Sequence, residues 1–139
     1  MSGPPYSGHC MCGGVRFEIT APPESAGYCH CTRCQRRTGT AASAQARIAP
    51  GTLRLLAGDE LIREYKPDDD GWGKCFCTVC GSALWSVNPD TGDIGSVRIG
   101  LLDPGHDIRP QWHSYTNYAC EWEPLPQDGL ERFPEAKPR

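Results

Sequence analysis

Cysteine is the residue type in this sequence whose spacing most clearly indicates chemistry, because most of the nine cysteines in its 139 residues fall into short clusters. The central cluster is Cys29-His30-Cys31-Thr32-Arg33-Cys34. Residues two apart in an extended segment point to the same side, so a C-x-C pair can offer both sulfurs to one metal ion. A following x-x-C can fold back as the tight thiolate turn of structural zinc sites. The cluster therefore predicts a metal site.

Two further cysteine groups frame this cluster: Cys10 with Cys12 upstream, and Cys75, Cys77 and Cys80 downstream. The simplest arrangement joins the upstream pair to Cys77 and Cys80 in a closed four-thiolate site, which would be structural. Three ligands from the central cluster would then leave one coordination position open for water or a substrate atom. The alternative is that every site is structural, with Cys75 as the fourth ligand of the central cluster. Spacing alone does not decide between the two.

Disulfide bonds are the competing use of so many cysteines. The N-terminal MSGPPYSGHC has neither the basic start nor the apolar core of a signal peptide, and no segment approaches the ~18 apolar residues of a membrane helix. An odd number of cysteines in a chain that is not secreted favours thiolates over bridges. We therefore expect a cytoplasmic protein that has no membrane association.

Composition narrows the function classes further. The formal net charge is −3 and the pI is about 5.8, which argues against nucleic-acid binding because that normally requires a basic face. The length predicts a single domain over 1–139, large enough for a core and small enough to be stabilised by metal. Nothing in the sequence indicates the oligomeric state.

Frequent short apolar segments separated by turn residues predict an all-β fold. The clearest is a strand over 15–19, where Val15, Phe17 and Ile19 alternate with polar residues. We expect one short helical turn over 35–39, a Pro/Gly lead over 1–8, and an irregular tail from Trp122 onward. The other strands predicted from this pattern are 41–48, 53–56, 61–65, 74–77, 83–87 and 96–99.

Several of these motifs, taken together, resemble a known family. They are the stretch from Gly8 to Phe17, the central cluster with Thr38-Gly39, the stretch from Phe76 to Ser82, and the ending His113…Trp122…Asp128-Gly129-Leu130. Their order and spacing resemble the glutathione-dependent formaldehyde-activating enzymes, which share a domain with centromere protein V. The resemblance covers residues 8 to about 134 and implies a β-tent, a fold of small antiparallel sheets around zinc.

The resemblance also implies two zinc ions with different roles. Cys10, Cys12, Cys77 and Cys80 would hold a structural ion, and Cys29, Cys31 and Cys34 a catalytic one. The implied activity is that of a carbon–sulfur lyase or synthase acting on adducts of an aldehyde with glutathione or another small thiol. The thiol would take the open zinc position, and its lowered pKa would yield a thiolate that attacks the aldehyde carbon.

Positive charge beside the central cluster suggests where a substrate could bind. Glutathione carries two carboxylates, and Arg33, Arg36 and Arg37 could pair with them; the alternative is a solvated basic turn. A second function class is a non-catalytic zinc-stabilised binding module, which a closed central site would favour. We expect Cys75 to be a free thiol, because the four-cysteine set is complete without it.

Other conspicuous residues are assigned mainly structural roles. His30 lies between two ligands and should point away from them, whereas His113 could reach a pocket. Cys120 is expected to be a spare buried thiol.

Overall fold

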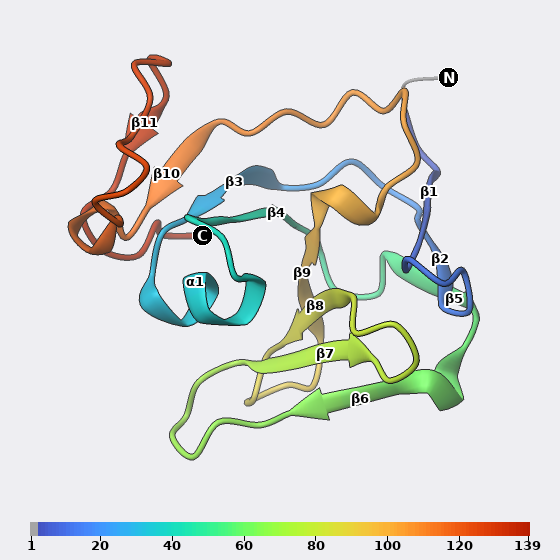
Figure 1. Ribbon diagram of the computed structural model, residues 1–139. Coiled ribbons are helices and arrows are strands. Elements are labelled where there is room, and N and C mark those ends of the chain that lie inside the picture. Colours follow the sequence, from blue (N-terminus) through green and yellow to red (C-terminus); the bar gives the residue numbers. More distant parts are fainter. Residues whose placement is uncertain (1–2) are drawn as a thin grey trace.

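Residues 3–139, which the computed structural model describes, form two β-sheets and one α-helix. The smaller sheet has the strand order β1–β2–β5, and both of its pairings are antiparallel (Figure 1). Its strands are β1 (Tyr6–His9), β2 (Arg16–Ile19) and β5 (Leu53–Ala57).

The larger sheet has eight strands in the order β11–β10–β3–β4–β9–β8–β7–β6. Its pairings are antiparallel, except that β10 runs parallel to both β3 and β11. The prediction of an all-β fold is confirmed. The strands are β3 (Ser25–Cys29), β4 (Ser43–Arg47), β6 (Ile62–Tyr65), β7 (Gly73–Cys77), β8 (Ala83–Val87), β9 (Ile94–Arg98), β10 (Trp112–Ser114) and β11 (Glu131–Arg132).

Short helical elements complete the described chain. The α-helix α1 spans Thr32–Thr38, and 3-10 turns cover Asp59–Leu61, Ile99–Leu101 and Thr116–Tyr118. None of the helices in residues 3–139 has the length and apolar character needed to cross a lipid bilayer.

Four strands lie where the sequence pattern predicted none: β1, β3, β10 and β11. β1 begins at Tyr6 inside the predicted Pro/Gly lead, whose first two residues lie outside the described part of the chain. β3 lacks clean alternation because Gly27 takes a position where Trp112 of β10 lies across it, and a Cβ on Gly27 would overlap the indole ring. These strands depend on long-range partners that a local pattern does not reveal.

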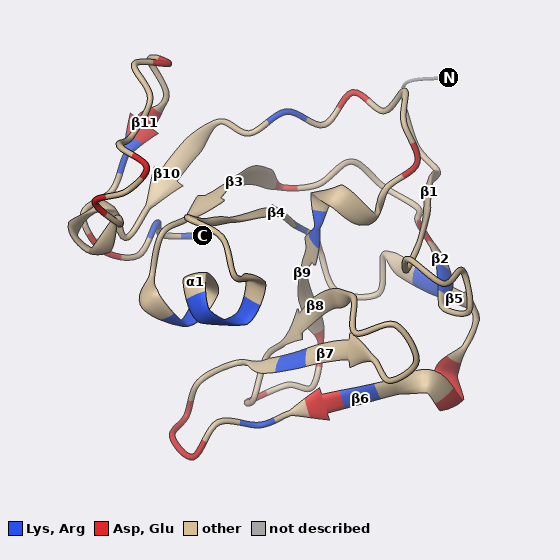
Figure 2. Cartoon of the chain, viewed as in Figure 1, with Lys and Arg blue, Asp and Glu red and all other residues tan. Residues whose placement is uncertain are grey.

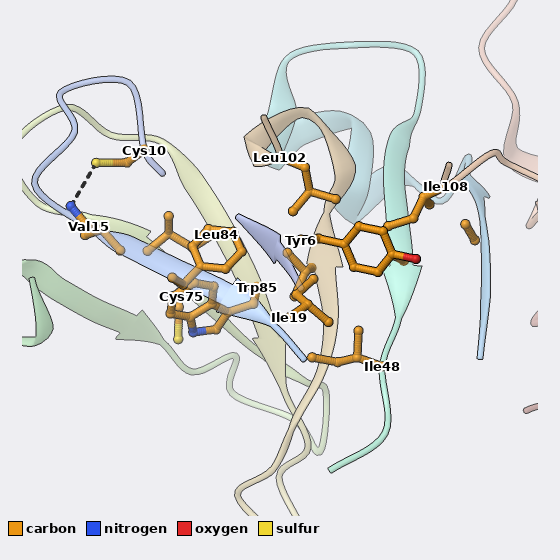
Figure 3. Packing of buried hydrophobic residues seen from close by; sticks show 14 of the residues in the cluster. Tyr6, Cys10, Val15, Ile19, Ile48, Cys75, Leu84, Trp85, Leu102 and Ile108 are labelled. Carbon is orange, nitrogen blue, oxygen red and sulfur yellow. Dashed lines mark hydrogen bonds between the residues drawn. The ribbon is translucent and has the colours of Figure 1, made fainter. Parts of the chain in front are cut away.

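The apolar core lies where β2 of the small sheet packs against β8 of the large one (Figure 3). Phe17 meets Trp85 edge to face, with ring centroids 5.4 Å apart. Ile19 and Leu84 are fully buried. Each such side chain contributes about 1.5–3 kcal/mol by leaving water. The core therefore holds the strand that follows the first cysteine pair against the sheet that contains the last one.

The side chains of strand β7 alternate between the buried core and the opposite face of the sheet. Gly73, Cys75 and Cys77 are buried, whereas Lys74 and Phe76 are half-buried and point to the other face of the sheet. That second face is the one turned toward α1, since side chains of α1 and these two residues line a common cavity.

The tail from Trp122 onward is mostly irregular, as predicted, and it returns to the sheet near β3 and β4 (Figure 1). Arg139 forms an ion pair with Glu24, 2.9 Å between Nη2 and Oε1, and its guanidinium lies over the ring of Trp72 at 5.8 Å. The last described residues thus lie beside the sheet face that carries the cavities.

Candidate metal centres and the adjoining cavity

Four cysteines from two distant segments of the chain lie close together in one group. Cys10 and Cys12 follow β1, Cys77 ends β7, and Cys80 lies in the turn before β8. Their four sulfurs all lie within 4.8 Å of one another; Cys10 and Cys12 are 3.5 Å apart and Cys12 and Cys77 are 3.9 Å apart. Tetrahedral zinc with bonds of about 2.3 Å places its sulfurs about 3.8 Å apart. The donor set and its spacing fit zinc.

Matching tight turns shape this group. Gly13 donates its N–H to the carbonyl of Cys10 at 3.0 Å, and Gly81 donates to the carbonyl of Cys77 at 2.8 Å. Both glycines have φ near +78°, a conformation that favours glycine. The N–H of Val15 donates to the Cys10 sulfur at 3.3 Å (Figure 3), which favours the thiolate form.

The second group consists of Cys29, Cys31 and Cys34, whose sulfurs also lie within 4.8 Å of one another. Cys29 ends β3, and Cys31 is the N-cap of α1: its sulfur accepts the N–H of Cys34 at 3.3 Å. Because a cysteine sulfur caps the helix, α1 begins at Thr32, three residues before the predicted turn over 35–39. The helix thereby brings Cys34 back toward Cys29.

The proton affinities of these three thiols are unequal. Hydrogen bonds from the thiols of Cys29 and Cys31 lower the pKa of Cys34 well below its usual range, and the positive charge of Arg98 acts in the same direction. The pKa of Cys29 is raised, first by its hydrogen bond to Cys31. The group therefore holds one thiolate in place for a cation.

The three-cysteine group lines a cavity of about 590 Å³, which the four-cysteine group does not line. Its floor is a row of polar side chains on the α1-facing side of the large sheet. The register places Lys74 opposite Ser86, Ser86 opposite Ser96, and Ser96 opposite Arg47. Tyr115, Tyr118, Trp72, Arg33 and Arg139 line the cavity as well.

A buried arginine, Arg98, adjoins this floor: it lies opposite Gln45 in the sheet and two residues after Ser96 in β9. Arg98 is 7% exposed; its Nη2 donates to Ser86 Oγ at 2.6 Å and its Nη1 to Gln45 Oε1 at 2.5 Å. Lys74 Nζ donates to the same Ser86 hydroxyl at 3.3 Å. Burial lowers the pKa of Arg98 to about 10, so the guanidinium keeps its charge at neutral pH.

The three arginines predicted to bind substrate occupy different positions. Arg33 lines the cavity but forms an ion pair with Asp69. Arg36 and Arg37 line a second cavity of about 720 Å³, which shares Arg33, Trp72 and Lys74 with the first. Arg37 is half-buried, and its Nη2 atom has no hydrogen-bond partner among the described residues.

The remaining residues singled out from the sequence lie away from the cavity. Cys75 is buried in the core and belongs to neither sulfur group; burial and then Glu64 raise the pKa of its thiol to about 11. His113, which was expected to be able to reach a pocket, is buried beside His30 and does not line this cavity. Cys120 is half-buried, so the expectation of a buried thiol is wrong.

Sequence reasoning missed the polar floor, and one signal could have found part of it. Lys74 lies between two buried residues of a strand, so alternation places it on the face opposite Cys75. Arg98, Ser86 and Gln45 could not be grouped in this way, because their proximity depends on the register of three strands that are distant in sequence.

Comparisons with known proteins show the family of this chain. A family model described as the glutathione-dependent formaldehyde-activating enzyme matches residues 5–118. A Halomonas elongata protein, named provisionally as such an enzyme, is 31% identical over 87 residues. That match covers 59% of this chain and 55% of the relative, so the chain spans about half the length of this curated protein.

A solved structure is also similar. The crystal structure of a Rhodobacter sphaeroides protein, a structural genomics target, has 26% sequence identity and a TM-score of 0.55. The superposition covers 70% of this chain and 88% of that one.

Proposed function

This chain belongs to the family of glutathione-dependent formaldehyde-activating enzymes, and on that premise we propose that it is a zinc-dependent carbon–sulfur lyase or synthase acting on thiol–aldehyde adducts. One observation carries the proposal: the three-cysteine group lines a cavity, whereas the four-cysteine group already has a complete ligand set. A complete set suits a structural ion, and three ligands beside a cavity suit a catalytic one.

The two groups divide the proposed roles. Cys10, Cys12, Cys77 and Cys80 would hold the structural zinc, and Cys29, Cys31 and Cys34 the catalytic zinc. When bound by three thiolates, zinc supplies the positive charge that lowers the pKa of a substrate thiol.

The reaction forms one bond and moves one proton. In the synthetic direction the substrate sulfur bonds to the aldehyde carbon, the carbonyl π pair becomes an O–H bond, and the thiol proton ends on that oxygen. With formaldehyde the product is an S-hydroxymethyl adduct. The lyase direction breaks the carbon–sulfur bond and returns the proton to sulfur.

Tyr115 is suited to donate a hydrogen bond to the aldehyde oxygen. It lines the cavity, and burial and then the negative charge of the three cysteines raise the pKa of its phenol, so the hydroxyl stays protonated and can donate a hydrogen bond. Its backbone has φ 55° and ψ 42°, a left-handed conformation that non-glycine residues adopt at a cost and that recurs at functional sites.

Glutathione, or another small thiol, is the proposed substrate. Its thiol end would occupy the cavity of about 590 Å³ beside Cys29, Cys31 and Cys34, hereafter the triad and the triad cavity, and its carboxylates would lie toward the basic side chains of α1. Arg33 lines the triad cavity, and Arg36 and Arg37 line the adjoining one, so a ligand that extends from the first cavity into the second would meet all three.

The proposal is tested by comparing zinc-loaded and metal-free protein. Calorimetry should detect glutathione binding only to the zinc-loaded form, and ¹³C NMR with labelled formaldehyde should show adduct exchange faster than the spontaneous rate. Cys31→Ser should remove both effects, while Cys120→Ser, which alters a cysteine outside both groups, should leave them. Glutathione binding that is equally strong without metal would contradict the proposal.

A further inference from the structure

We propose that Lys74 and Arg98, linked through Ser86, make the triad cavity selective for thiols that carry a negatively charged group. In this proposal Lys74 binds the charged group of the ligand, and Arg98 is a positioning residue that offsets the negative charge at the triad. The inference rests on the proposed function in one respect: it takes the ligand of the triad to be a thiol.

The charge of the cavity wall is the first observation. No Asp or Glu is among the described residues that line this cavity, although the chain as a whole has a net charge of −3. Four cations line it: Arg33, Arg47, Lys74 and Arg139. Figure 2 shows the basic segments of α1 and β7 and the basic end of β9; β6, the edge strand beside β7, carries one basic and one acidic residue, Arg63 and Glu64. The cavity is thus suited to an anion.

Of these four cations, Lys74 is the one best able to bind a ligand, because the other three already interact with carboxylates or an aromatic ring of the protein. Arg33 and Arg139 form ion pairs with Asp69 and Glu24, and Arg47 lies over the ring of Trp112. Lys74 has the Ser86 hydroxyl as its hydrogen-bond partner within the described residues. An ammonium group has three donors, so Lys74 has donors left for a ligand.

Arg98 supplies the second observation, because it is a buried charge without a carboxylate partner. Within residues 3–139 its hydrogen bonds run to neutral groups, and its Nε atom has no partner. A buried cation requires a compensating negative charge. Burial and then Arg37 lower the pKa of Arg98, and the groups that act in the opposite direction are the sulfurs of Cys34, Cys29 and Cys31.

A bound thiolate leaves one cation of the cavity unmatched. Three thiolates around a divalent zinc ion would leave one negative charge, and a bound substrate thiolate would add a second. Arg98 and Arg47, which forms no ion pair with a carboxylate among the described residues, can match these two charges, so Lys74 remains for a negatively charged group on the ligand. Lys74 then attracts a carboxylate on the ligand and repels an ammonium group.

A purely structural role is the competing explanation, since the Arg98 side chain bridges β4, β8 and β9 through Gln45 and Ser86. The two explanations differ in what they predict for ligand charge. A structural role affects the binding of all thiols equally, whereas the proposed role discriminates between them.

The test uses three small thiols of similar size and different charge with the zinc-loaded protein: 3-mercaptopropionate, 2-mercaptoethanol and cysteamine. We expect calorimetry to give the tightest binding for the anion and the weakest for the cation, with a preference of about tenfold for 3-mercaptopropionate over 2-mercaptoethanol. Lys74→Gln should remove that preference, and Lys74→Arg should retain it. Arg16→Gln is the matched control, because it removes an exposed charge on β2 outside the cavity.

Arg98 is tested through metal affinity rather than activity. Arg98→Gln should weaken zinc binding at the triad about tenfold while leaving the four-cysteine site unchanged, and Arg98→Lys, which keeps the charge, should recover most of the loss. If Arg98→Gln does not fold, Arg98→Lys still decides: a loss as large as that expected for the glutamine variant would overturn the proposed role of charge.

The outcomes separate this inference from the proposed function. Equal binding of the three thiols by the native protein, or an anion preference that survives in Lys74→Gln, would overturn the inference and leave a thiol site. Failure of all three thiols to bind the zinc-loaded protein would overturn both.

Discussion

His30 and His113, which are 83 residues apart in sequence, face each other with His30 Nε2 2.8 Å from His113 Nδ1. The other ring nitrogen of His113, Nε2, lies 2.8 Å from the Asp128 carboxylate. The three side chains form one hydrogen-bonded series, in which the two histidines are buried and Asp128 is exposed, and it reaches the segment between Cys29 and Cys31. The tail is thereby connected to the segment that presents two of the three cavity cysteines.

Asp128 determines which nitrogen atoms donate in the hydrogen bonds between these three side chains. An ionised Asp128 only accepts, so His113 carries its proton on Nε2 and accepts at Nδ1. His30 must then donate from Nε2. Burial, followed by the neighbouring His113, lowers the pKa of His30, which keeps its ring neutral and suited to this arrangement.

Replacing His113 with phenylalanine tests this connection. His113→Phe keeps the ring that stacks on Tyr28, with centroids 5.1 Å apart, but removes both hydrogen bonds. The buried donor of His30 is left without a partner, so we expect a loss of about 1–3 kcal/mol of unfolding free energy and weaker metal binding at the triad. Urea denaturation of the zinc-loaded protein measures the first effect. His106→Phe, a histidine in a separate loop, should cost much less, and equal losses would contradict the prediction.

Metal removal should occur in two steps. Four thiolates bind zinc more tightly than three, so we expect a chelator to strip the triad first while the protein stays folded, and to strip the four-cysteine site only together with unfolding. Chelator titration followed by both metal release and circular dichroism would show this. Cys77→Ser should destabilise the fold, and Cys31→Ser should mainly empty the triad. Simultaneous loss of both ions with unfolding would count against two distinct sites.

Cys75 should behave as a free core thiol. Because it is buried and its pKa is raised to about 11, alkylation of the folded protein at pH 8 should not modify it, whereas alkylation after unfolding should. Cys75→Ser should retain the zinc content and thiol binding of the native chain, with a loss of about 1–2 kcal/mol from the buried hydroxyl. Loss of one zinc ion, or a gain of thiol binding, would instead make Cys75 a ligand that closes the triad.

Gly27 should tolerate no side chain. In Gly27→Ala the added methyl group would overlap the ring of Trp112, which lies across it in the parallel β3–β10 pair. We expect a loss of about 1–3 kcal/mol and displacement of β10 together with His113. Amide exchange of β10 would report the displacement. Gly100→Ala is the matched control, because no atom lies within 4 Å of the Cβ that it adds.

Local sequence patterns predicted the elements whose own residues show a periodicity or a characteristic spacing. Alternation placed the strand containing Phe17, and the cysteine spacing favoured both sulfur groups while leaving open whether Cys75 belongs to the central one. The start of α1 was missed because a cysteine sulfur, rather than one of the usual polar caps, initiates it at Thr32. The sequence predicts a helical turn over 35–39, and the cap at Cys31 extends the helix back to Thr32.

What local patterns could not provide is the assembly of distant strands. β10 pairs in parallel with β3 although more than 80 residues separate them, and its three residues have no periodicity to detect. The buried Arg98 is a similar case, because its partners Gln45 and Ser86 come from two other strands. Register and packing, rather than residue type, create the charged floor of the cavity.

The two sulfur groups also differ in the length of chain that each one closes. Cys12 and Cys77 are 65 residues apart, whereas Cys29 to Cys34 is a single short segment. During synthesis the three triad cysteines are all present once residue 34 has been made, whereas the four-sulfur group must wait until residue 80 has been made and the long intervening loop has closed. The weaker site is thus the first that can capture an ion, and the stronger one is the last. With the proposed two zinc ions, the order in which the protein would gain its metals during synthesis is the same as the order in which a chelator should remove them, with the triad first in both.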